Sequence, residues 1–136
     1  MNIIEQAPTV SDIIAKVCEV AAANPHTVYE RVENPWDCAL YVHPDGSPGC
    51  GIGHALCELG IADASWYSED DDRVINTHAI RDLLVNDLSR IGIVKLTDAD
   101  AARRIGWLSV FQRANDNGTE WGEAVRLADL AYPGAR

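Results

Sequence analysis

Long apolar runs are missing from this chain of 136 residues. No segment approaches the roughly 20 consecutive apolar residues that a membrane-spanning helix needs, so we expect no membrane partner. The first six residues lack the basic start and the apolar stretch of a signal peptide. The sequence therefore favours a cytoplasmic protein, in which the four cysteines are expected to be thiols or metal ligands and not disulfides.

Basic residues are scarce in the first half of the chain. Residues 1–72 contain thirteen Asp and Glu against two Lys and Arg, a net charge of −11. Residues 73–136 contain eight against nine, a net charge of +1, so the chain carries −10 in total. Such a chain repels the phosphates of nucleic acids, and we expect no direct DNA or RNA binding. The acidic half leaves open a basic protein partner or DNA mimicry, and solubility is its simplest role.

Internal repeats and an alternation of strands with helices are absent, whereas helical periodicity is common. The content of 47% hydrophobic and 24% charged residues is typical of a soluble globular protein. We therefore predict a single mainly α domain over residues 1–136, a bundle of about five helices. The expected helices span about 12–23, 50–59, 78–91, 97–115 and the segment after Thr119 to about 131. Their expected N-caps are Thr9, Ser11 or Asp12 for the first helix, Thr77 for the third, a capping box over 97–100, and Thr119 for the last.

A small element of two strands is expected beside these helices. Residues 27–32 are β-branched and alternating enough for one short strand, and residues 38–42 read as a second. Together they predict a small hairpin or two irregular arms.

The helix over about 50–59 is expected to lie at the centre of the bundle. It is apolar on both sides, and Glu58 is its only charged residue. Gly51 and Gly53 lower its intrinsic stability by about 1 kcal/mol each relative to alanine. Their missing side chains also allow another segment to approach closely, which favours a packing role for this helix.

Thiol and imidazole side chains gather around this helix, at Cys38, His43, Cys50, His54 and Cys57. These are the ligand types that zinc prefers, so a small structural zinc site is one alternative. The Cys-x2-Cys pair of most structural zinc sites is missing, and we predict no cofactor.

A second alternative makes Cys50 the nucleophile of a thiol hydrolase or transferase. A cysteine at a helix N-terminus feels the helix dipole, which lowers the pKa of the thiol. His43 is the better candidate base, and His54 is less well placed, on the same helix. The simpler interpretation buries Cys50 as a small core residue and bonds His54 to the backbone or to Tyr41.

The stretch Cys38-Ala39-Leu40-Tyr41 and the turn and helix start at 46–56 resemble small uncharacterised proteins of actinobacteria and their bacteriophages. In that group a Cys-x-x-Tyr segment precedes a Pro-Gly-Cys-x-x-Gly helix start, here ending at Gly53. Residues 27–30 share the likeness, which covers roughly 10–62. The resemblance implies a small cytoplasmic protein encoded by a phage, for which binding of a host protein is a common role; it transfers no activity.

A non-enzymatic interaction protein is therefore the expected function: a phage-type modulator that binds a host protein or associates with a second copy as a homodimer. Aromatic residues dominate binding hot spots. The aromatic side chains expected at the interface are Trp66, Trp107, Phe111 and Trp121.

Overall fold

The structure is a computed structural model, and it describes residues 7–33, 39–67, 75–97 and 99–136. Within these ranges the protein is mainly helical, as predicted. Their five α-helices are α2 (Val10–Ala23), α3 (Gly51–Glu58), α4 (Ile80–Asp82), α5 (Ala101–Asp116) and α6 (Trp121–Ala131). Two 3₁₀ turns, η1 (Ala64–Trp66) and η2 (Ile75–Thr77), and the π-helical stretch η3 (Leu83–Leu88) accompany them.

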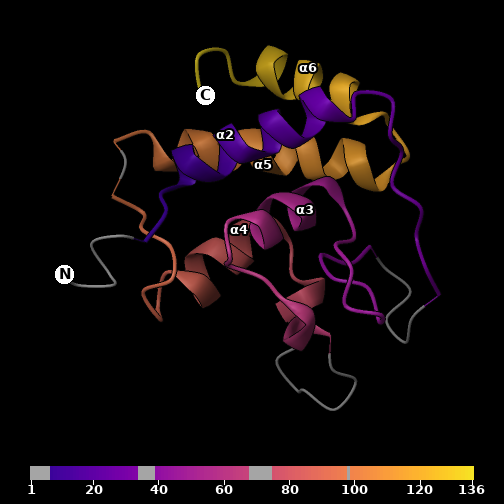
Figure 1. Ribbon diagram of the computed structural model, residues 1–136. Coiled ribbons are helices and arrows are strands. Elements are labelled where there is room, and N and C mark those ends of the chain that lie inside the picture. The colour runs from indigo at the N-terminus through magenta and orange to yellow at the C-terminus, as the bar shows by residue number, and fades with distance from the viewer. Residues whose placement is uncertain (1–6, 34–38, 68–74, 98) are drawn as a thin grey trace.

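The helices pack in layers around one core (Figure 1). α2 and α5 lie between α6 on one side and α3 with α4 on the other. One cluster of buried apolar side chains draws on all five helices. None of the helices in the described ranges has both the length and the apolar character that crossing a membrane requires.

α2 begins where the sequence predicts a cap. The Asp12 backbone N–H donates to Thr9 Oγ1 at 3.2 Å, and the Thr9 N–H donates to Asp12 Oδ2 at 2.9 Å. This reciprocal pair is a capping box, and it satisfies two backbone donors at the start of the helix. The buried side chains then recur at helical spacing: Val10, Ile13, Ile14, Val17, Val20 and Ala21. The helix ends at Ala23, and Asn24 caps it before Pro25.

α3 is buried against its neighbours because its glycines lack side chains. A Cβ added to Gly53 would lie 2.1 Å from the Tyr41 carbonyl oxygen. A Cβ added to Gly51 would lie 2.8 Å from the ring of Phe111. The predicted close approach is therefore confirmed on both sides of the helix, toward residue 41 and toward α5.

The helix expected over about 78–91 is present but shorter and not uniform. It runs as α4 into the π-helical turn η3, from Ile80 to Leu88. Thr77 does not cap it; the residue lies in η2, and the helix has no side-chain cap hydrogen bond at Ala79. The Ile80 N–H donates instead to Oε1 of Gln112 on α5, at 2.9 Å.

The expected two-strand element at 27–32 and 38–42 is wrong, because the described part of these segments forms only the isolated bridge between Val42 and Pro48. The side chain of Asn76 takes both backbone groups of Val42. The Val42 N–H donates to Asn76 Oδ1 at 2.9 Å, and Asn76 Nδ2 donates to the Val42 carbonyl at 2.8 Å. The two segments do meet, but through the Tyr29 hydroxyl, which accepts from the Leu40 N–H at 3.0 Å. Side chains therefore replace the strand ladder.

The caps expected for α5 and α6 are also wrong. α5 begins after Asp100 without a side-chain cap, and α6 begins after Glu120, one residue beyond Thr119, also without one. The first N–H groups of α6 have backbone partners instead. Trp121 donates to the Thr27 carbonyl and Gly122 to the Pro25 carbonyl, each at 2.9 Å. The segment after α2 thus satisfies donors that a capping side chain would otherwise serve.

Candidate functional site

Among the described residues, those predicted as metal ligands do not gather at one point. Cys38 lies outside the described residues. Cys50 is buried, whereas His43, His54 and Cys57 are half-buried. In the part of the chain that the structure describes, no group of three or more His, Cys, Asp or Glu is placed to hold a metal ion. The described residues therefore lend no support to the zinc alternative.

Cys50 sits at the N-terminus of α3, where its sulfur accepts the Gly53 N–H at 3.4 Å. The residue is 2% exposed, and burial raises the pKa of its thiol to about 12 although the backbone N–H groups of the helix start lower it. Desolvation therefore outweighs the helix terminus. With that pKa, only about one thiol in 10⁵ is ionised at pH 7. Cys50 acts as a helix cap, and this argues against its role as a nucleophile.

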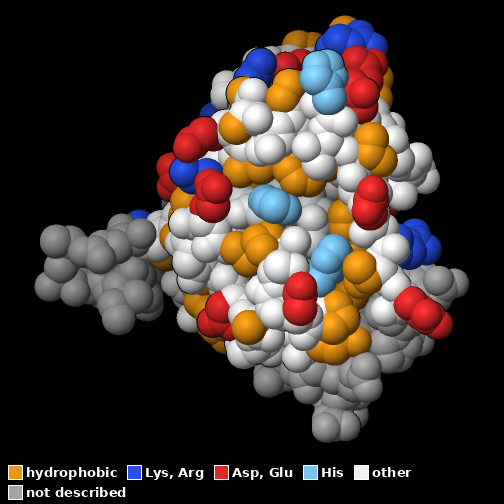
Figure 2. All heavy atoms as spheres, turned by 45° about the vertical axis from the view of Figure 1, so that its right-hand side comes forward, with side chains coloured by type: hydrophobic (Ala, Val, Ile, Leu, Met, Phe, Trp, Pro, Cys, Tyr) orange, Lys and Arg blue, Asp and Glu red, His pale blue; other side chains and the backbone are white. Residues whose placement is uncertain are grey.

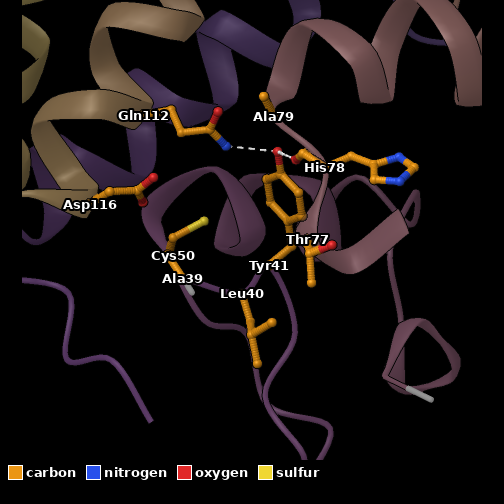
Figure 3. A pocket seen from close by; sticks show the side chains of 9 residues that line it. All are labelled: Ala39, Leu40, Tyr41, Cys50, Thr77, His78, Ala79, Gln112 and Asp116. Atoms are coloured by element: carbon orange, nitrogen blue, oxygen red, sulfur yellow. Dashed lines mark hydrogen bonds between the residues drawn. The ribbon is translucent and has the colours of Figure 1, made fainter. Parts of the chain in front are cut away.

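A small cavity lies beside Cys50, with a volume of about 170 Å³ (Figure 3). The Tyr41 hydroxyl donates to the His78 carbonyl at 2.6 Å and accepts from Gln112 Nε2 at 2.7 Å. Because Gln112 Oε1 serves the start of α4, the phenol and the amide are both occupied in joining residue 41, α4 and α5. These groups lock the fold and are not free to bind a ligand.

Asp116 reaches the same cavity from the end of α5 (Figure 3). Burial raises the pKa of its carboxyl to about 6, although Arg31 opposes the shift. A carboxyl with this pKa can give or take a proton near neutral pH. The thiol of Cys50, which lines the same cavity, is not ionised at that pH and so supplies no nucleophile for it to assist. The cavity holds no complete catalytic set among the described residues.

A more open hollow, which we call the histidine groove, is lined by Val28, Tyr29, Glu30, His43, His54 and Trp121 among others and has a volume of about 340 Å³. The segment after α2, the turn before α3, α3 itself and α6 all contribute to it. Figure 2 shows a face on which histidine side chains lie among apolar ones. Two of the predicted candidate histidines and one of the predicted interface tryptophans therefore share this groove.

His43 is held by a hydrogen bond to Tyr29. The Tyr29 hydroxyl lies 3.1 Å from His43 Nε2 and already accepts the N–H of Leu40. A hydroxyl has one proton to donate and two lone pairs, so Tyr29 can serve Leu40 and His43 at the same time and joins the two segments through one side chain. Burial lowers the pKa of His43, although Asp45 raises it.

His54 lacks the predicted bond to Tyr41, whose hydroxyl is engaged elsewhere. Its ring meets the indole of Trp121 edge-on, with the ring centroids 5.0 Å apart. Burial lowers the pKa of His54, Glu58 raises it and His43 lowers it further. Both groove imidazoles are therefore neutral near pH 7.

Trp121 has a polar atom without a partner. The residue is 3% exposed, and no acceptor for its Nε1–H lies among the described residues. Trp107 provides the contrast, because its Nε1–H donates to Asp129 Oδ1 at 2.9 Å. A buried donor left without an acceptor costs about 1–3 kcal/mol, so a ligand that supplied one would gain binding free energy.

The other predicted interface residues pack inside the protein. Trp107 and Phe111 are 0% exposed and stack on each other with centroids 5.9 Å apart. Trp66 is half-buried, with its ring edge-on to Tyr41 at 6.1 Å. Trp107 and Phe111 thus stabilise the core and offer no surface to a partner, in contrast to the sequence-based expectation.

Neither a protein-family model, nor a curated protein, nor a solved structure matches this chain. The site therefore has to be judged from its own residues. Sequence reasoning missed the pairing of Tyr29 with His43, because residues fourteen positions apart in irregular segments give no periodic signal. The Tyr-Glu pair at 29–30 and the turn at 43–49 were visible, but only the fold brings them together.

Proposed function

We propose that the chain is a non-enzymatic protein-interaction module that binds a short basic segment of a partner protein in the histidine groove. The observation that carries the proposal is Trp121, a residue of the groove whose buried indole N–H has no acceptor in the described part of the chain.

Charge favours a basic segment. Glu30 is the only carboxylate among the nine residues lining the groove, and no Lys or Arg lines it. Its imidazoles are neutral for the reasons above, so they add no positive charge. Residues 1–72, which supply eight of those nine residues, carry a net charge of −11. A Lys or Arg of the partner would meet the exposed Glu30 carboxylate, to which a cation is attracted.

Polar and apolar contacts add to this attraction. A backbone carbonyl of the partner segment would accept the Trp121 N–H and remove the penalty of leaving it unpaired. Val28 is 41% exposed at the edge of the groove and offers an apolar contact. The half-buried His54 ring, packed on the buried Trp121 and beside the buried Tyr29, provides the rigid aromatic surface that binding hot spots favour.

We infer that the partner is a host protein from the resemblance of residues 38–56 to phage and actinobacterial proteins. In that reading the chain is a phage-type modulator. The neutral thiol of Cys50 and its lack of a histidine partner among the described residues support the non-enzymatic alternative over a thiol enzyme.

Two exposed glutamates on one segment provide a matched test. Glu30 lines the groove, and Glu33, three residues later, does not. Affinity capture from host lysate would compare the wild type with Glu30→Lys and Glu33→Lys. We expect one protein to be recovered by the wild type and by Glu33→Lys and to be lost with Glu30→Lys. Equal recovery by all three proteins, or no enriched protein at all, would refute the proposal.

A further inference from the structure

A second hollow lies along α5, and it shares no lining residue with the histidine groove. We call it the arginine groove; Arg81 and Val85 line it from α4 and η3, Gly106, Ser109 and Arg113 line it from α5, and Tyr132 follows α6. Its volume is about 460 Å³. We infer that the arginine groove binds an acidic peptide segment of a partner through Arg81 and Arg113.

The approach of Tyr132 to α5 in this groove depends on Gly106. A Cβ there would lie 2.4 Å from Tyr132 Cζ and 2.7 Å from its hydroxyl oxygen. The Tyr132 phenol therefore lies directly on the backbone of α5. Its hydroxyl forms no hydrogen bond to the residues that the structure describes, so it is free to donate to an incoming carboxylate.

The two arginines have no counter-ion among the described residues, although the chain has 21 Asp and Glu for 11 Lys and Arg. Three other cations are paired with carboxylates: Lys16 lies 3.1 Å from Glu19, Arg136 lies 2.9 Å from Asp129, and Arg126 lies 2.5 Å from Glu123. Neither Arg81 nor Arg113 has an ion pair or a hydrogen bond within the described ranges. Two unneutralised guanidinium groups at one groove favour a ligand with negative charge, and their planar forks match carboxylates.

The length of the groove favours a peptide. Its lining residues extend along α5 from Ala102 to Arg113. Eleven residues of α-helix rise roughly 16 Å, about the length of five residues of extended chain. Val85, which is 39% exposed, and Ile105 add apolar surface between the charged ends. A segment that alternates acidic and apolar side chains would therefore match the groove.

The test uses the ¹⁵N-labelled full chain and the peptide acetyl-Glu-Leu-Glu-Leu-Glu-amide, with the Gln analogue as the uncharged probe. We expect saturable shifts of the Gly106 and Tyr132 amide signals with the Glu peptide, weaker binding at higher salt, and none with the Gln peptide. Arg81→Ala and Arg113→Ala should each weaken binding about tenfold. Arg90→Ala removes an exposed arginine outside the groove and should leave binding unchanged.

Each opposite result overturns the inference. Equal binding of the Gln peptide, equal loss with Arg90→Ala, or shifts that do not saturate would show that the groove is no acidic-peptide site. Inorganic phosphate provides a further arm: if it binds the same residues more tightly than the Glu peptide, the ligand is a phosphate and not a carboxylate peptide. Circular dichroism of each variant checks the fold. Because the two grooves share no residue, failure here leaves the Glu30 test unaffected.

Discussion

Replacement of Gly53 by alanine tests whether α3 is packed as closely as the structure indicates. The new Cβ would lie 2.1 Å from the carbonyl oxygen of Tyr41 and 2.8 Å from its carbonyl carbon and Cα. A normal contact between carbon and oxygen begins near 3.3 Å, so the two segments must separate by about 1 Å. The obstacle is backbone, which cannot rotate away as a side chain would.

Three effects set the size of the change. Alanine gains about 1 kcal/mol over glycine in a helix interior. Overpacking of this kind costs about 1–3 kcal/mol. Displacement of residue 41 also weakens the bond from the Gly49 N–H to the Tyr41 carbonyl, now 2.7 Å long, which contributes about 1 kcal/mol. We therefore expect Gly53→Ala to lower the free energy of unfolding by about 2 kcal/mol.

Urea denaturation followed by circular dichroism measures this loss. The control is Ala15→Gly at an exposed position of α2, which reports helix propensity alone and should cost about 1 kcal/mol. If Gly53→Ala were as stable as the wild type, or more stable, the propensity gain would prevail and the close packing of α3 against residue 41 would be refuted.

Three further predictions concern the core and the histidine groove. Iodoacetamide at pH 7.5 should leave Cys50 unlabelled in the folded protein and label it in urea; rapid labelling of the native thiol, read by peptide mass spectrometry, would contradict its raised pKa. Asn76→Ala should lower the free energy of unfolding by roughly 2–5 kcal/mol, because both backbone groups of Val42 lose their buried partner; a urea midpoint close to that of the wild type would argue against this role. Because burial lowers the pKa of His43 and of His54, these rings favour folding above their ordinary pKa of about 6.5 and lose that contribution as the pH falls through the lowered values. NMR titration should place both midpoints below 6.5, and a midpoint above that value would contradict the burial.

Much of the helical pattern was predictable because it depends on local signals. The stripe of α2, its cap at Thr9 and the glycines at 51 and 53 follow from spacing and side-chain size alone. The packing role predicted for Gly51 and Gly53 is confirmed by the close approaches to both residues. It was predictable because the absence of a Cβ can be read from the sequence. What approaches them is not visible there, and only the fold shows that the ring of Phe111 approaches Gly51 and the backbone of Tyr41 approaches Gly53.

The errors arise where distant side chains replace local structure. Asn76 takes both backbone groups of Val42, although 34 residues separate them, so the strand expected at 38–42 has no strand partner. The N–H of Trp121 binds the Thr27 carbonyl, so Thr119 is not needed as a cap. The helix-dipole argument for a reactive Cys50 omits burial, which raises the pKa of the thiol and depends on tertiary packing, not on position at a helix start.

The indole N–H of Trp121 tests the central proposal most directly. Its NMR signal in ¹⁵N-labelled protein would be followed while the partner recovered by affinity capture is added. The Trp107 signal is an internal reference, because its N–H is already bonded to Asp129. We expect the Trp121 signal to move downfield and saturate with the partner while the Trp107 signal stays in place. A saturating complex in which the Trp121 signal does not move would contradict binding in the histidine groove.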